Sequence, residues 1–205
     1  MTIDLVNLGK RFKSQWVFKD LNAQINDGET IAIIGPNGSG KSTLIKIISA
    51  ALSPSRGEVK YLLGGEPKES EQVFNYISYA APYLELLEEY SLSEMIDFQL
   101  NFKALRADLT KEEVQSWLNF DPNKPIKDYS SGMKQRLKLA LAVSADSDLL
   151  LLDEPTSNLD SQGMAWYKEL IEKYTSDRTV LIGSNQPEEF RDFAGREIAL
   201  SDFKS

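Results

Sequence analysis

The chain contains neither cysteine nor histidine. Without cysteine there is no disulfide framework and no thiolate metal site. Without histidine the commonest zinc ligand is missing, and so is the side chain that most often acts as a general base near neutral pH. The sequence therefore disfavours zinc chemistry and histidine-based acid–base catalysis.

Long apolar runs and basic clusters are also missing. No stretch of 18 or more apolar residues occurs, so no segment is expected to span a membrane. The N-terminus lacks the basic start and apolar core of a signal peptide. The formal net charge is −8 and no Lys/Arg cluster stands out, which argues against a nucleic-acid partner. We expect a cytoplasmic protein that acts at a membrane only through a partner.

The length of 205 residues and the hydrophobic share of 41% predict about one α/β domain. Strands are predicted over residues 2–8, 16–25, 30–34, 58–63, 73–79, 149–152, 179–183 and 197–200, the first two as an antiparallel pair. Helices are predicted over residues 41–52, 91–106, 110–120, 130–144, 161–174 and 187–193. Residues 80–87 form a loop or a short helix.

The strongest motif lies between the predicted strand 30–34 and the helix that follows it. It matches G-x-x-x-x-G-K-[ST], in which glycines bring backbone N–H groups up to phosphate oxygens at a helix N-terminus. A lysine then contacts the β- and γ-phosphates, and a hydroxyl contacts Mg²⁺. The alternative is a turn that binds nothing. The predicted nucleoside triphosphate site comprises Gly35, Pro36, Asn37, Gly38, Ser39, Gly40, Lys41, Ser42 and Thr43.

Two acids, Asp153 and Glu154, follow the apolar run 149–152. Four consecutive leucines suit a central parallel strand, and ligands bind at the carboxyl edge of such sheets. We predict that Asp153 holds Mg²⁺ and that Glu154 orients or deprotonates an attacking water. A solvated strand end is the alternative reading.

With these motifs the chain resembles the ATP-binding-cassette (ABC) ATPase subunits over nearly all of its length. Residues 35–43 resemble Walker A, 149–154 Walker B, 129–136 the family signature and 157–160 the D-loop. The signature is usually Leu-Ser-Gly-Gly-Gln; here Tyr, Ser and Met replace three of its residues. The resemblance implies an α/β P-loop NTPase (RecA-like) core with a mostly parallel sheet, a small antiparallel β part and an inserted helical lobe. We expect the core at about 1–78 and 145–205, and the lobe at about 79–144.

The signature residues Ser130, Ser131 and Gly132 open a predicted helix. The Ser130 hydroxyl can cap this helix, and with the helix N-terminus it forms a second anion site. The resemblance implies that this site binds the γ-phosphate of ATP held by a second cassette, identical or not, so that two cassettes enclose the nucleotide. An ordinary serine-capped core helix is the alternative.

Other positions are assigned through the resemblance alone. Phe12 matches the aromatic residue that stacks on adenine, with Trp16 as a competing candidate, and either could simply pack in the fold. Asn185 stands where the family has its switch histidine, so it can donate a hydrogen bond but cannot shuttle a proton. Hydrolysis is therefore expected to run through Glu154 and to be slow. Pro82 stands where the family has a glutamine, and Glu85 is a possible replacement.

The segment around Pro82 is rich in aromatic and apolar residues. We interpret it as a docking surface for a coupling helix of a membrane partner, with the core of the lobe as the alternative. These residues are Tyr76, Tyr79, Tyr83, Leu84, Leu86 and Leu87.

The sequence as a whole favours an ATP-binding and ATP-hydrolysing subunit of an ABC transporter. It would use ATP and Mg²⁺, dimerise around the nucleotide, and drive a separate transmembrane permease from the cytoplasmic face of the cell membrane. Three alternatives stay open: a soluble ABC ATPase acting on ribosomes or DNA, a weakly hydrolysing regulatory cassette, and a P-loop small-molecule kinase. The kinase would leave residues 130–132 unexplained.

Overall fold

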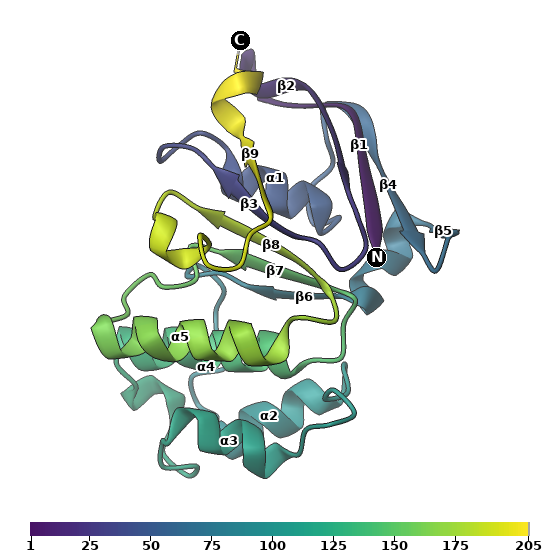
Figure 1. Cartoon of the computed structure of the whole chain (residues 1–205). Coiled ribbons are helices and arrows are strands. Elements are labelled where there is room, and N and C mark those ends of the chain that lie inside the picture. The colour runs from purple at the N-terminus through teal and green to yellow at the C-terminus, as the bar shows by residue number, and fades with distance from the viewer. Residues whose placement is uncertain (205) are drawn as a thin grey trace.

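Two β-sheets form the framework of the protein, whose computed structural model describes residues 1–204 (Figure 1). The antiparallel sheet has the order β2-β1-β4-β5, and the parallel sheet has the order β6-β7-β8-β3-β9. The predicted combination of a parallel sheet with a small antiparallel part is confirmed. The antiparallel strands are β1 (Thr2–Phe12), β2 (Gln15–Ile25), β4 (Arg56–Leu63) and β5 (Glu66–Lys68); the parallel strands are β3 (Thr30–Ile34), β6 (Ile77–Ala80), β7 (Leu149–Asp153), β8 (Thr179–Ser184) and β9 (Arg196–Ala199).

The helices occupy three levels of this framework (Figure 1). Helix α1 (Lys41–Ile48) lies between the two sheets, and α4 (Ser131–Ser144) and α5 (Ser161–Tyr174) cover the other face of the parallel sheet. Helices α2 (Leu92–Leu100) and α3 (Lys111–Leu118) lie beyond α4, away from the sheet. Short 3₁₀ turns are η1 (Ser70–Tyr76), η2 (Ile126–Asp128), η3 (Pro187–Glu189) and η4 (Leu200–Phe203).

The central strand β7 shows why its four leucines are consecutive. Leu149 and Leu151 pack with α1 and the antiparallel sheet, whereas Leu150 and Leu152 pack with α4 and α5. Successive strand residues point to opposite faces, so a strand covered on both sides needs apolar residues throughout. All five residues of β7 are buried.

A third apolar cluster joins α2 and α3 to the outer face of α4. Ser91 and Thr110 cap the two short helices through complete capping boxes with Glu94 and Glu113. Each box satisfies backbone N–H groups at a helix start that would otherwise lack partners.

Helix α2 is shorter than the predicted 91–106, because it ends at Leu100. The chain beyond it pairs with distant backbone instead of continuing the helix. Lys103 donates to the carbonyl oxygens of Phe74 and Ile77, and Leu105 forms a β-bridge with Ala145. Tertiary hydrogen bonds thus override a helix-forming sequence.

Other boundaries shift by smaller amounts. Strand β1 runs on to Phe12 rather than ending at residue 8, and α1 stops at Ile48 rather than at residue 52. Residues 70–76 form η1, so the strand predicted at 73–79 begins at Ile77. Helix α5 has the predicted bounds. Among residues 1–204, every helix is too short or too polar to cross a bilayer.

Candidate active site

The glycine-rich loop leaves β3 at Ile34 and enters α1 at Lys41. Gly40 has φ +106°, a backbone conformation that L side chains rarely adopt. A Cβ at this position would lie 2.4 Å from Cγ1 of Val17 on β2, and a Cβ at Gly35 would lie 2.6 Å from Oγ of Ser39. The loop therefore needs glycine both for its backbone angles and for its close approach to β2.

Lys41 turns back into this loop. Its side chain is almost fully buried, and Nζ donates to the carbonyl oxygens of Gly35 at 2.8 Å and Pro36 at 3.4 Å. A buried ammonium group beside free N–H groups at a helix N-terminus is suited to bind phosphate. The lysine that the sequence predicted as a phosphate ligand therefore lies inside the predicted phosphate-binding loop.

Asp153 ends β7, and its carboxylate is buried. Oδ2 accepts a hydrogen bond from the Tyr83 hydroxyl at 2.9 Å, while Oδ1 has no partner among the described residues. A Cβ on Gly183 of β8 would lie 3.1 Å from Oδ1, so the absence of a side chain there leaves room for the carboxylate. An unpaired buried carboxylate oxygen is costly unless something satisfies it.

That oxygen fits a magnesium ligand. Mg²⁺ is usually held by one or two carboxylates together with phosphate oxygens and water rather than by an all-protein cage. Within residues 1–204 no group of three His, Cys, Asp or Glu side chains gathers as a metal cage would require. Asp153, with Ser42 in the first turn of α1, could hold Mg²⁺ brought in by a nucleotide.

Glu154 follows directly and lies in an unusual backbone conformation. Its φ is +45°, and its N–H donates to the Gly183 carbonyl at 2.8 Å. Strained non-glycine residues cluster at functional sites because the surrounding structure must hold them. The side chain is partly exposed, so its carboxylate can reach solvent at the edge of the sheet.

Asn185 reaches the loop from the neighbouring strand. β8 ends at Ser184 and pairs with β3, so the residue after β8 lies beside the residues after β3. The Asn185 side chain amide donates to Oδ1 of Asn37 at 3.1 Å. Both residues are exposed, and a groove of about 500 Å³ lies beside them, lined in part by Gly35, Pro36 and Asn185.

The signature residues lie at the start of α4. The Ser130 hydroxyl accepts the N–H of Met133 at 3.2 Å, and Ser130 itself is exposed. A Cβ on Gly132 would lie 3.0 Å from the Asn158 carbonyl oxygen, so α4 and the D-loop are in close contact. Ser130, Ser131 and Gly132 line a groove of about 490 Å³, and this groove shares no residue with the one beside Asn185.

The two aromatic candidates for base stacking differ in exposure. Phe12 is 53% exposed at the tip of the β1–β2 hairpin, and β2 passes Gly40 at Val17. Trp16 is partly buried against Gly9 and the Arg11 guanidinium. Phe12 is therefore the more exposed of the two candidates, with Nζ of Lys10 5.3 Å from its ring centroid.

The structure shows which residue approaches Asp153 from the segment that lacks the family glutamine. Pro82 contributes only its carbonyl, which accepts Nζ of Lys138 at 2.5 Å. Glu85 is exposed and lines grooves farther along the segment. Tyr83, which the sequence reading treated only as part of an apolar surface, makes the contact with Asp153.

Two buried polar residues near the site were given no role from the sequence. Glu189 accepts the N–H of Thr156 at 3.0 Å and also its hydroxyl, and burial raises the pKa of this carboxyl. Gln135 of α4 donates to the Pro155 carbonyl at 2.7 Å. Both hold the turn that follows Glu154, one from η3 and one from the signature helix.

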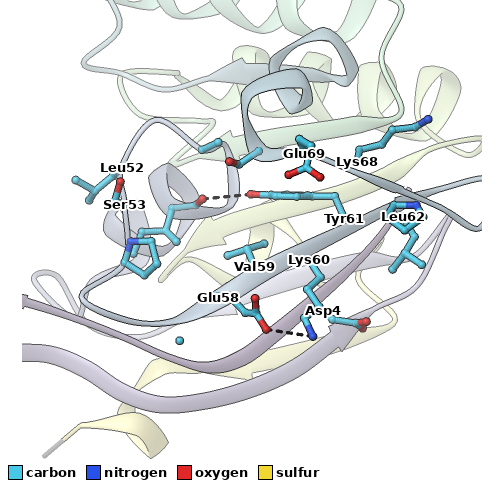
Figure 2. A pocket seen from close by; sticks show the side chains of 16 residues that line it. Asp4, Leu52, Ser53, Glu58, Val59, Lys60, Tyr61, Leu62, Lys68 and Glu69 are labelled. Carbon is cyan, nitrogen blue, oxygen red and sulfur yellow. Dashed lines mark hydrogen bonds and ion pairs between the residues drawn. The ribbon is translucent and has the colours of Figure 1, made fainter.

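A larger cavity lies away from these residues. It has a volume of about 580 Å³ and lies beside β4, β5 and the carboxyl-terminal end of α1, and Figure 2 shows the side chains that line it. The Tyr61 hydroxyl there donates to the Ile48 carbonyl at 2.9 Å, closing the end of α1. Charges of both signs line this cavity, among them Glu58 and Lys60, which pair with each other.

Comparisons with known proteins agree with this geometry. The sequence profile described as ABC transporter matches residues 18–157. An uncharacterised ABC transporter ATP-binding protein of Bacillus subtilis is 30% identical over 87% of this chain, and the chain spans 59% of its length. A lantibiotic transport ATP-binding protein of Streptococcus pyogenes is 30% identical over 94% of this chain and 85% of its own.

Solved structures give the same picture. An ATP-binding cassette in a dimeric post-hydrolysis state, bound to ADP and Pi, superimposes with a TM-score of 0.84 at 25% identity over 98% of this chain and 95% of its own. An ATP-binding protein of Pyrococcus furiosus, a putative ABC transporter by name, superimposes with a TM-score of 0.84 at 21% identity over the whole of both chains. The predicted fold class is confirmed.

Proposed function

The chain belongs to the ABC transporter family, and we propose that it is the ATP-hydrolysing subunit that dimerises around Mg²⁺–ATP to drive a separate membrane permease. One observation carries the proposal. Asp153, Glu154 and Asn185 lie at the carboxyl ends of β7 and β8, next to the loop that follows β3, and Asn185 contacts that loop directly. Ligands of open α/β sheets bind at this edge.

Each residue has a role that its position supports. Loop N–H groups and Lys41 bind the β- and γ-phosphates, and Ser42 and Asp153 hold Mg²⁺. Mg²⁺ held by these two residues would neutralise charge on the phosphates. Glu154 orients the attacking water and accepts its proton, and Asn185 donates a hydrogen bond toward the γ-phosphate. Phe12 stacks on the base.

Dimerisation is supported by the position of the signature. Ser130 is exposed at the cap of α4, and the groove that it lines shares no residue with the groove beside the loop. A second anion site that lies apart from the first can bind the nucleotide held by another subunit, and so complete the nucleotide site of that subunit. The similar solved cassette is itself a dimer bound to ADP and Pi, which supports dimerisation.

A permease would dock on the segment after β6. A groove of about 230 Å³ there is lined by apolar residues such as Leu84, Leu86 and Leu141, with Lys103 and Lys138 at its polar side. Nearby, Tyr83 and Leu87 are among the most exposed large apolar residues of the described chain. Such a surface fits an amphipathic helix of a partner, and it would place the subunit at the cytoplasmic face of the membrane.

We assign the parts of this single ABC ATPase domain accordingly. The core at about 1–78 and 145–205 binds and hydrolyses ATP, and the lobe at about 79–144 carries the signature and the docking segment. The separate apolar cluster of α2, α3 and α4 supports this division, because a lobe with its own core can move as a unit.

The decisive test is Glu154→Gln. We expect ATP hydrolysis by the purified chain to fall at least about 100-fold, as for loss of a general base. Binding of ATP should persist, and light scattering should show an ATP-dependent dimer. Glu188→Gln, an exposed acid on η3, is the matched control and should change neither. Unchanged turnover in Glu154→Gln would refute the assigned chemistry.

A weakly hydrolysing regulatory cassette is the second candidate, and the asparagine at the switch position favours it. Loss of turnover in Glu154→Gln, together with a gain of the ATP-dependent dimer, excludes this candidate, and Asn185→Ala tests the role of the amide in the same assay. A several-fold loss of turnover supports an active role for the amide, whereas a faster variant excludes it. Copurification with a membrane protein, rather than with RNA or DNA, distinguishes transport from action on ribosomes or DNA.

A further inference from the structure

The hydroxyl of Tyr83 lies beside Asp153, the last residue of the central strand β7. It donates to Oδ2 of Asp153 at 2.9 Å, and its ring is 44% exposed in the loop after β6. A tyrosine that is nearly half exposed could direct its hydroxyl to water. It is directed instead to the carboxylate that we assign to magnesium.

A second tyrosine fixes the direction of this hydrogen bond. The hydroxyls of Tyr79 and Tyr83 are in contact, and a carboxylate can only accept. Tyr83 has one proton and gives it to Asp153, so Tyr79 must donate to Tyr83. The result is a chain of donors from Tyr79 through Tyr83 to Oδ2, and such chains strengthen each member.

Contacts on the ring hold Tyr83 in place. Nζ of Lys46 on α1 lies 4.2 Å from the ring centroid, and the Tyr79 ring packs edge-on with centroids 6.4 Å apart. A cation over a ring face is attracted by the ring quadrupole. Tyr83 thus joins three elements of the site: the loop after β6, the phosphate helix α1 and the end of β7.

Protonation does not interrupt this arrangement. Burial raises the pKa of the Tyr83 hydroxyl, and the neighbouring Tyr79 and Asp153 raise it further. Burial also raises the pKa of Tyr79. Tyr83 therefore remains a hydrogen-bond donor throughout the physiological pH range.

We propose that Tyr83 is a positioning residue for the metal ligand: by holding Oδ2 of Asp153, it leaves Oδ1 as the oxygen presented to the Mg²⁺ of the nucleotide. The inference rests on the proposed function, because it needs Mg²⁺–nucleotide at this edge. Its support is the asymmetry of the carboxylate, in which one oxygen is hydrogen-bonded and the other is buried with no partner among residues 1–204. Hydrogen-bonding partners of metal ligands fix ligand orientation.

The same contact has an opposite reading with an opposite consequence. If Mg²⁺ had to displace the hydroxyl from Oδ2, Tyr83 would compete with the metal and its removal would strengthen Mg²⁺-dependent binding. If Tyr83 positions the carboxylate, its removal weakens that binding. The sign of the change therefore decides between them.

The experiment measures the affinity of a non-hydrolysable ATP analogue, AMP-PNP, with saturating Mg²⁺ and with EDTA. The ratio of the two affinities is the magnesium enhancement. In Tyr83→Phe we expect the enhancement to fall about 10-fold, the lower end of the losses seen when such partners are removed. The affinity in EDTA should stay unchanged, which a general loss of structure would not allow.

Matched variants complete the design. Tyr90→Phe removes a hydroxyl from another partly buried tyrosine nearby and should leave the enhancement unchanged. Tyr79→Phe and Lys46→Met weaken the support of Tyr83 without removing its hydroxyl, so both should lower the enhancement by less. If Tyr83→Phe does not fold, the magnesium enhancement of these two variants tests the proposal instead.

An equal or larger enhancement in Tyr83→Phe, or no change in both supporting variants, overturns the proposal. Failure of the proposed function would look different: the wild-type chain would not bind AMP-PNP at all, or would bind it with no enhancement by Mg²⁺.

Discussion

The protein carries two helix N-termini that we assign to phosphate, and they are built in contrasting ways. Helix α1 begins after Gly40, whose left-handed backbone offers no side chain to the first turn, and a buried lysine supplies the charge. Helix α4 begins after its cap residue Ser130. The Ser130 side chain is exposed, and its hydroxyl already accepts a backbone N–H.

The difference indicates a division of labour. The loop before α1 is enclosed by β2 and by the contacts of Lys41 with its own carbonyls, so it is shaped before any ligand arrives. The start of α4 is stabilised by its cap and opens onto a groove shared with the D-loop. The first site is preorganised within one chain, and the second is presented outward.

The largest expected effect comes from replacing the loop glycine. Gly40→Ala forces an L side chain into a left-handed backbone, costing about 1–2 kcal/mol. It also drives Cβ into Val17, and such overpacking adds about 1–3 kcal/mol. We expect thermal unfolding at clearly lower temperature and loss of ATP binding.

Gly132→Ala is the counterpart at the other helix. Gly132 does not have a positive φ, and its added Cβ would lie 3.0 Å from the Asn158 carbonyl oxygen and 4.0 Å from Oγ of Ser130. The alanine gains about 1 kcal/mol of helix propensity, which offsets this contact. Melting curves should therefore show little change. Equal destabilisation by the two substitutions would contradict the proposal that the backbone requires glycine before α1 but not at the start of α4.

Lys41→Met has the next largest effect. It removes charge-assisted hydrogen bonds to phosphate, each contributing about 1.5–3 kcal/mol, so ATP affinity should fall about 10- to 100-fold. Methionine roughly keeps the buried volume, so the fold should persist. Calorimetric titration with Mg²⁺–ATP provides the measurement, and Lys134→Met on α4 is the control. Unaltered affinity would show that the loop does not bind phosphate as proposed.

The strand–loop–helix order of the enclosed site and the capped start of α4 could both be predicted from the sequence. Residues 35–43 follow a spacing that the backbone itself requires, because glycines at positive φ and a strand–loop–helix order leave one arrangement. The run 149–152 likewise predicted a strand covered on both faces, and β7 is such a strand. These are local patterns, which can be recognised in a single sequence.

The parts that the sequence did not reveal depend on tertiary contacts. Tyr83 meets Asp153 across 70 positions of the chain, and Glu189 meets Thr156 across 33. Neither residue has a periodic or spacing signal. The early end of α2 has the same origin, because Lys103 and Leu105 bond to residues 26 to 40 positions away. Features set by residues close together in the chain were therefore predicted better than features set by contacts between distant residues.

The smallest effect should come from Ser130, and it separates capping from anion binding. Aspartate and asparagine cap helices about as well as serine, so Ser130→Asp and Ser130→Asn should each change the free energy of unfolding by no more than about 0.5 kcal/mol. Only aspartate places a negative charge where a partner's γ-phosphate would bind. ATP binding by single subunits should be normal in both variants.

The ATP-dependent dimer of the Glu154→Gln background provides the readout. Light scattering should show the dimer weakened at least about 10-fold by Ser130→Asp, since a like charge opposes the phosphate. Ser130→Asn should retain most of it. Because the cap is equal in the two variants, any difference between them measures charge at the outward site. Equal dimerisation would mean that the start of α4 is only a capped helix and that the two N-termini do not share a ligand.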